Sequence, residues 1–186
     1  MYSELKLFID GKWLNGEGRK GEDVINPATG KVLGHLPHAS KADLDEALAA
    51  AAKGFQLWKA TSAYDRAKIM RKAADLLRER ADHVSTVQTQ EQGKVYVESR
   101  MEVLTSADII DWYAEEGRRS YGRVVPGRTK GVRQIVLQEP VGVVAAFTPW
   151  NFPTLTPVRK IAGALAAGCS LIIKASEETP AAASSW

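Results

Sequence analysis

The sequence VGVVAAFTPWNFP, residues 141–153, joins an unbroken apolar run to a loop that holds one asparagine between two prolines. The run Val141–Phe147 has the length and composition of a parallel strand that is covered on both faces. Asn151 therefore follows the carboxyl end of a strand, which is the edge where open α/β sheets bind ligands. Its neutral amide can donate hydrogen bonds to a developing oxyanion. An asparagine that caps a helix or closes a turn fits the same local pattern.

A helix and a second apolar strand follow this loop. The helix is predicted from Thr156, with Pro157 in its first turn and Gly168 at its end. Its small residues form one face: Ala162, Gly163, Ala164, Ala166 and Ala167. The strand 170–173 completes a βαβ unit over residues 141–174. The sequence thus predicts an α/β fold that contains the start of a doubly wound, Rossmann-like parallel sheet.

The last residues predict the start of another helix, with Thr179 as its cap and Pro180 at its first position. Two parallel strands cannot bury both faces of a sheet by themselves. We therefore expect the chain to be cut off inside a domain.

The N-terminal part predicts a hairpin followed by helices. Asp10-Gly11 is a strong turn signal between strands at 5–9 and 12–14, and a further strand is expected at 31–36. Capping patterns at Ser40 and Ser62 predict two helices, Gly93 ends a third, and a fourth covers 97–116. Core positions are expected for two helical stripes: Leu44, Leu48, Ala51 and Phe55, and Met101, Leu104, Ile109 and Trp112.

Residues 121–125 and 133–138 predict a long β-hairpin around a Gly/Pro-rich basic loop. Its alternating second strand leaves an unpaired edge, which proteins usually cover. We expect this hairpin to act as an oligomerisation arm. The chain then divides into an N-terminal hairpin and helical part at 1–120, the arm at 121–140 and the first βαβ unit at 141–186.

Composition excludes several classes of function. The 186 residues carry 25 basic and 22 acidic side chains without a block of like charge, so no nucleic-acid partner is expected. No segment approaches the roughly 18 apolar residues that span a bilayer, and the start lacks the pattern of a signal peptide. A single cysteine fits a reducing compartment, so a cytoplasmic location is expected. His35, His38 and His83 form no metal-ligand spacing, and we expect them in solvated loops.

Lys174 and Glu177 offer a second group of candidate binding residues. Both strands of a βαβ unit end at the same edge, so Lys174 and Asn151 are expected to share a ligand. A cation and a carboxylate in one short loop suit the two hydroxyls of a ribose, and the carboxylate would repel a 2′-phosphate. A surface salt bridge is the structural alternative.

Three motifs together resemble the NAD(P)-dependent aldehyde dehydrogenase family: TPWNFP at 148–153, ALAAGC at 164–169 and KASEETP at 174–180. NPATG at 26–30 is also similar to its N-terminal part. The resemblance implies that Asn151 is an oxyanion-hole asparagine and that Thr148, Pro149 and Trp150 border the nicotinamide half of the cofactor. It further implies that the loop Lys174, Ala175, Ser176 and Glu177 lies at the adenosine ribose. The cofactor would be NAD, with NADP possible.

The resemblance is nearest to the succinate-semialdehyde dehydrogenase branch. It implies that Arg159 grips a substrate carboxylate, for which a guanidinium is chemically suited. It also implies a homo-oligomer, dimer or tetramer, that oxidises a small semialdehyde. An exposed helical arginine without such a role is the alternative.

The residues that the reaction needs are incomplete in this chain. The family uses a cysteine thiolate and a glutamate base, and its pattern places both beyond residue 186. Cys169 sits at a helix-to-strand junction without a base or cation in its local sequence, which is typical of an inert cysteine. We therefore expect the 186 residues to be inactive alone. A naturally short, non-catalytic partner of full-length subunits is the alternative function.

Overall fold

The computed structural model describes residue 2 and residues 4–184. The strands are β1 (Leu7–Ile9), β2 (Lys12–Leu14), β3 (Gly21–Ile25), β4 (Val32–Pro37), β5 (Arg123–Pro126), β6 (Arg133–Val136), β7 (Val143–Phe147) and β8 (Ser170–Lys174). The helices are α1 (Lys41–Ala60), α2 (Ala63–Glu79), α3 (Ala81–Gln92), α4 (Tyr96–Gly117), α5 (Leu155–Ala166) and α6 (Pro180–Ser184). This is the mixed α/β architecture that the sequence predicts.

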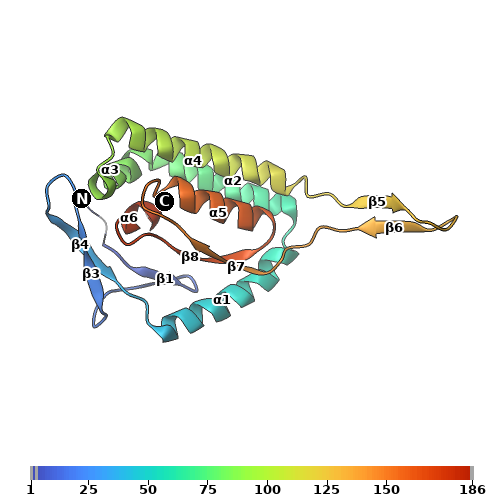
Figure 1. Ribbon diagram of the computed structural model, residues 1–186, viewed down its shortest axis with the longest axis horizontal. Coiled ribbons are helices and arrows are strands. Elements are labelled where there is room, and N and C mark those ends of the chain that lie inside the picture. The colour runs from blue at the N-terminus through green and yellow to red at the C-terminus, as the bar shows by residue number, and fades with distance from the viewer. Residues whose placement is uncertain (1, 3, 185–186) are drawn as a thin grey trace.

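A two-stranded parallel sheet, β7–β8, lies between helical layers. Helix α5 connects the two strands and contacts one face, whereas α1 contacts the other (Figure 1). The βαβ unit is thus confirmed, with β7 beginning two residues later than predicted and α5 one residue earlier. Gly168 has a φ of +88°, so it adopts the left-handed conformation expected after a helix end.

The main hydrophobic core fills the space among α2, α3, α4 and α5. Its largest fully buried side chains include Leu77, Val84, Val103 and Val158. Small residues let α5 approach closely: a Cβ at Gly117 would lie 2.8 Å from the carbonyl oxygen of Ala166. The small-residue face of α5 therefore serves helix packing.

The capping patterns of α1 and α2 are confirmed. Ser40 and Asp43 form a reciprocal capping box, and the hydroxyl of Ser62 accepts from the amide of Asp65 at 3.1 Å. Asp43 also receives two hydrogen bonds from Arg19, at 2.5 and 2.9 Å. These hydrogen bonds hold the pKa of Asp43 well below its usual range, and they join the N-terminal loop to α1.

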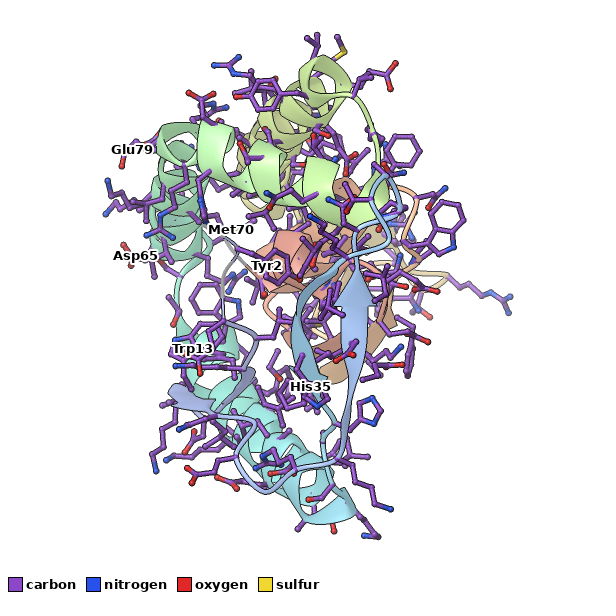
Figure 2. All side chains as sticks on the ribbon, turned by 90° about the vertical axis from the view of Figure 1, so that its left-hand side faces the viewer. Tyr2, Trp13, His35, Asp65, Met70 and Glu79 are labelled. Atoms are coloured by element: carbon purple, nitrogen blue, oxygen red, sulfur yellow. The ribbon has the colours of Figure 1, made fainter. Side chains whose placement is uncertain are left out.

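Two antiparallel pairs precede α1. The β1–β2 hairpin is confirmed, and β4 covers the strand expected at 31–36. Its partner β3 was not predicted, because GEDVI has polar residues on both faces and buries only Val24. Figure 2 labels Tyr2, whose ring packs so closely on β4 that a Cβ at Gly34 would lie 2.8 Å from it.

The β5–β6 hairpin extends away from the rest of the chain (Figure 1). Every residue in both strands is exposed. The predicted hairpin is therefore correct, although β5 begins at Arg123 rather than Tyr121 and β6 ends at Val136 rather than Gln138.

Several predicted burials are wrong. Val143 and Phe147 of β7 are 39% and 70% exposed, because this strand pairs only with β8 and borders an open apolar hollow of about 570 Å³. Leu44 and Leu48 on α1 are about half exposed, although α1 contacts β1 and the sheet and its Trp58 donates to the carbonyl of Leu165 on α5 at 2.8 Å. Met101 and Trp112 on α4 are exposed, because α4 turns Val103, Ala107, Ile110 and Ala114 toward α2 and α5 instead.

Candidate functional site

The carboxyl ends of β7 and β8 form one edge, as expected for parallel strands. Phe147 pairs in register with Lys174, and the amide of Thr148 donates to the carbonyl of Lys174 at 3.2 Å. The loop after β7 carries Asn151, and the loop after β8 carries Glu177. The structure therefore brings the two predicted groups of site residues to the same edge of the sheet.

The loop after β7 has buried ends and an exposed centre. Thr148 and Pro153 are buried, whereas Pro149, Trp150 and Asn151 between them are exposed. The loop thus fixes its ends in the protein and presents its centre, including the amide of Asn151, to solvent.

A buried polar network holds the far end of this loop. Glu102 of α4 accepts hydrogen bonds through Oε1 from the amides of Thr154 and Leu155, at 3.0 and 3.1 Å. Its Oε2 accepts from Gln88 and from Lys94, both at 2.7 Å. The hydroxyl of Thr154 donates to Oε1 of Gln88 at 2.7 Å. The carboxylate therefore caps α5 at its N-terminus with all four of its acceptor positions filled.

Lys94 connects this network to Asn151. Its ammonium lies 2.7 Å from Glu102 and 3.2 Å from the main-chain carbonyl oxygen of Asn151. It also lies 4.2 Å from the centre of the Phe152 ring, within the range of a cation–π contact. The side chains of Lys94 and Glu102 are only 11% and 3% exposed.

Sequence reasoning missed Gln88, Lys94 and Glu102. The available signal was the polar stripe of Ser99, Glu102 and Ser106, which recurs at helical spacing beside the apolar stripe of α4. A glutamate on a buried helix face requires partners. The sequence did not show that these partners come from α3, from the connection between α3 and α4 and from the start of α5.

The loop after β8 carries the second candidate group. Lys174 and Glu177 form an ion pair, and both side chains are about half exposed. The hydrogen bond from Lys174 lowers the pKa of Glu177 and keeps it ionised. Between them, Ala175 is half-buried and Ser176 is buried. The observed geometry is thus that of an exposed salt bridge, the structural alternative that the sequence left open for this pair.

The cap predicted for α6 is wrong. The hydroxyl of Thr179 is buried without a hydrogen-bond partner. Glu91 of α3 caps the helix instead, accepting from the amides of Ala181 and Ala182 at 2.8 Å each. Each amide bonds to its own carboxylate oxygen, Ala181 to Oε1 and Ala182 to Oε2, so the glutamate satisfies both donors.

The remaining candidates are Arg159, which lies on α5, and Cys169, which lies at the junction before β8. Arg159 is exposed on α5. Cys169 is 3% exposed, and tertiary structure brings the guanidinium of Arg66 near it, a cation that its local sequence lacks.

The three histidines are exposed, and His38 lies in a loop, as expected. The loop prediction is wrong for His35, which lies in β4 beside Asp23, and for His83, which lies in α3. Figure 2 shows His35 on its strand. Within residues 2 and 4–184, no group of His, Cys, Asp and Glu side chains could hold a metal ion. In the same part of the chain, no helix has the length and apolar character needed to cross a bilayer.

Comparison with known proteins identifies the family of this chain. The aldehyde dehydrogenase family model matches residues 13–185. The chain belongs to the aldehyde dehydrogenase family. Use of NAD(P) is a general property of this family, and its members are typically oligomeric enzymes that act on aldehydes.

Individual relatives agree with this assignment. The chain is 45% identical over 97% of its length to 4-(hydroxymethyl)benzenesulfonate dehydrogenase TsaD1 of Comamonas testosteroni, of which it covers 38%. It is 38% identical over 94% of its length to succinate semialdehyde dehydrogenase of Acinetobacter baylyi, of which it covers 36%. The chain thus spans less than two-fifths of the length of these aldehyde dehydrogenase relatives.

Solved structures of the family share the fold. Aldehyde dehydrogenase from Brucella melitensis biovar abortus 2308 superposes with a TM-score of 0.93 at 43% identity, over 96% of this chain and 37% of that one. Succinate-semialdehyde dehydrogenase from Burkholderia pseudomallei gives 0.93 at 38% identity, over the same shares. The α/β arrangement described above is therefore that of the aldehyde dehydrogenase family.

Proposed function

We propose that the complete protein oxidises an aldehyde to a carboxylic acid with NAD(P)+. The observation that carries this proposal is the placement of the Asn151 loop and the Lys174–Glu177 pair at one edge of a parallel sheet. Open α/β sheets bind nucleotides at this edge. Membership of the aldehyde dehydrogenase family supports the reaction type.

Asn151 has the role of oxyanion donor. Its exposed amide can donate to the carbonyl oxygen of the aldehyde as negative charge develops there. Cys169, the only cysteine among the 186 residues, is buried, so we do not assign it the role of the attacking thiolate. Thr148, Pro149 and Trp150 border the nicotinamide half of the cofactor.

The exposed pair Lys174 and Glu177 fits an adenosine ribose, with Ala175 and Ser176 forming the loop between them. The bound dinucleotide supplies a hydride acceptor. Ionised Glu177 disfavours a 2′-phosphate, so NAD is the preferred cofactor. Replacing Glu177 with Gln should shift the ratio of kcat/KM values toward NADP+, measured with each cofactor at saturating aldehyde. An unchanged ratio would contradict this role.

An anionic aldehyde is the proposed substrate class, with a small semialdehyde as the leading member. The named substrates of several relatives share an anionic group: succinate semialdehyde, glutarate semialdehyde, 4-(hydroxymethyl)benzenesulfonate and 3-sulfolactaldehyde. Arg159, exposed on α5, is the proposed clamp for that group. The Arg159→Gln variant should raise KM for succinate semialdehyde but not for butanal, whereas Lys160→Gln should change neither.

The decisive experiment uses the protein expressed at its full native length. Wild type should reduce NAD+ with an aldehyde, and Asn151→Ala should lower kcat about 10²- to 10³-fold with an unchanged unfolding temperature. An Asn151→Ala variant as active as wild type would contradict the oxyanion role. Inactivity with every aldehyde, together with co-purification of a longer aldehyde dehydrogenase, would favour the non-catalytic partner instead.

The exposed β5–β6 hairpin supports a homo-oligomer, since its strands have free edges. Removal of residues 123–136 should lower the mass measured by light scattering. A mass per particle that falls only by the deleted residues would contradict the oligomerisation role.

A further inference from the structure

We infer that Lys94 is a positioning residue for Asn151, acting with Glu102 and Gln88 to fix the oxyanion-binding amide. This inference rests on the proposed role of Asn151 and deepens it. Lys94 does not reach the exposed amide itself. Its ammonium donates to the main-chain carbonyl oxygen of Asn151 at 3.2 Å and lies 4.2 Å from the centre of the Phe152 ring.

The geometry makes Lys94 the direct link between the buried core and Asn151. Asn151 is exposed and lies between two prolines, Pro149 and Pro153. Its carbonyl accepts from Lys94 and, at 3.5 Å, from Gln92. The longer contact is the weaker of the two. The ammonium of Lys94 therefore restrains the backbone from which the amide of Asn151 projects.

Lys94 can exert this restraint because its own position is fixed. Glu102 lies 2.7 Å from its ammonium, and the same carboxylate accepts from Gln88 and from two amides of α5. These contacts are almost fully buried, so water competes for them weakly. A displacement of the lysine would leave Glu102 with an uncompensated buried charge. The network thus connects the loop of Asn151 to the packed helices α3, α4 and α5 and restrains its position.

Rigid placement matters because oxyanion stabilisation depends on donors aimed in advance at the developing charge. A mispositioned amide loses stabilisation of the transition state and leaves ground-state binding nearly intact. Loss of Lys94 should therefore lower kcat more than it raises KM.

The test is a double-mutant cycle in the full-length protein, with NAD+ and succinate semialdehyde. Lys94→Met should lower kcat about 10- to 100-fold with little change in KM. In the Asn151→Ala background the same change should lower kcat less than twofold, because Lys94 acts only through Asn151. Lys41→Met is the matched control: the side chain of this lysine is 85% exposed and pairs with Asp45 on its own helix, so kcat should not change.

A second variant separates positioning from folding. In Lys94→Met/Glu102→Gln both charges are absent, and a flipped Gln88 amide can still pair with the new glutamine and with Thr154. This variant should unfold near the wild-type temperature and still show the low kcat of Lys94→Met. Wild-type kcat in the neutral variant, or equal losses from Lys94→Met in both backgrounds, would overturn the inference. Loss of all aldehyde oxidation in wild type, or no effect of Asn151→Ala, would overturn the proposed function itself.

Discussion

Helices α5 and α6 both begin beside the candidate site, and each receives a buried glutamate at its N-terminus. Glu102 accepts from two amides of α5, at 3.0 and 3.1 Å, and Glu91 accepts from two amides of α6, both at 2.8 Å. The two contacts are alike in geometry. They differ in what balances the charge of each carboxylate.

The carboxylate of Glu102 pairs with a cation, whereas that of Glu91 accepts a hydrogen bond from a neutral side chain. Lys94 lies 2.7 Å from Glu102, but the further side-chain partner of Glu91 is the hydroxyl of Tyr2, at 2.5 Å. Burial therefore raises the pKa of Glu91, although its hydrogen bonds act in the opposite direction. The carboxyl group that caps α5 is therefore part of a nearly buried ion pair, whereas the one that caps α6 has no cation beside it and ionises less readily.

The largest effect is expected from Glu102→Ala. This change leaves Lys94 buried without its counter-ion and two amides of α5 without acceptors. We expect a loss of about 3–5 kcal/mol in the free energy of unfolding, measured by urea titration of the chain. Glu98→Ala, on the exposed face of the same helix, should change stability by less than about 0.5 kcal/mol. Equal losses of unfolding free energy in the two variants would contradict the stabilising role of the buried contacts of Glu102.

A smaller loss is expected from Glu91→Ala. Two amides of α6 and the hydroxyl of Tyr2 lose their acceptor, but no buried cation is left behind. The expected cost is about 1–3 kcal/mol in the same titration. If Glu91→Ala lost more unfolding free energy than Glu102→Ala, the presence of Lys94 beside Glu102 would not explain the difference between the two caps.

Tyr2→Phe should have a still smaller effect. The variant removes one hydrogen bond to Glu91 and keeps both amide contacts, so we expect a loss of about 1 kcal/mol. Because the hydrogen bond from Tyr2 lowers the pKa of Glu91, that pKa should rise further in the variant. Tyr121→Phe, at a residue 72% exposed, is the control and should leave stability unchanged.

The smallest effect concerns pH. The folded chain binds the proton of Glu91 more tightly than the unfolded chain, because the folded pKa lies above the ordinary value of 4.5. The associated stability is fully present below about pH 4.5 and is lost as pH rises through the raised pKa. The free energy of unfolding of wild type minus that of Glu91→Gln should therefore fall between pH 4.5 and neutrality. A difference that rises with pH would contradict the raised pKa.

Local patterns predicted much of the fold. Ser40 with Asp43 and Ser62 with Asp65 start helices where expected, and Gly93 ends one with a φ of +78°. These signals succeed because a cap or a turn involves residues within four positions of one another. The βαβ unit was predictable for the same reason, since strand, helix and strand follow directly in the chain.

Burial and partners were predictable only in part. Helical spacing identified apolar stripes on α1 and α4, but Leu44, Met101 and Trp112 are exposed. Periodicity shows which side of a helix is apolar and not which neighbour covers it. The motif around Asn151 located the candidate site. No local pattern indicated that Lys94 bonds to the carbonyl of Asn151, 57 positions away.

The sequence by itself determined most of the elements, the caps at Ser40, Ser62 and Gly93 and the shared edge of β7 and β8. It also located the candidate residues Asn151, Lys174 and Glu177. Only the tertiary structure decided that Glu91 replaces Thr179 as the cap of α6 and that Glu102 and Lys94 anchor the loop of Asn151. The physical reason is desolvation. A buried carboxylate must find donors wherever the packed chain supplies them, and this requirement selects partners by position in space rather than by spacing in the sequence.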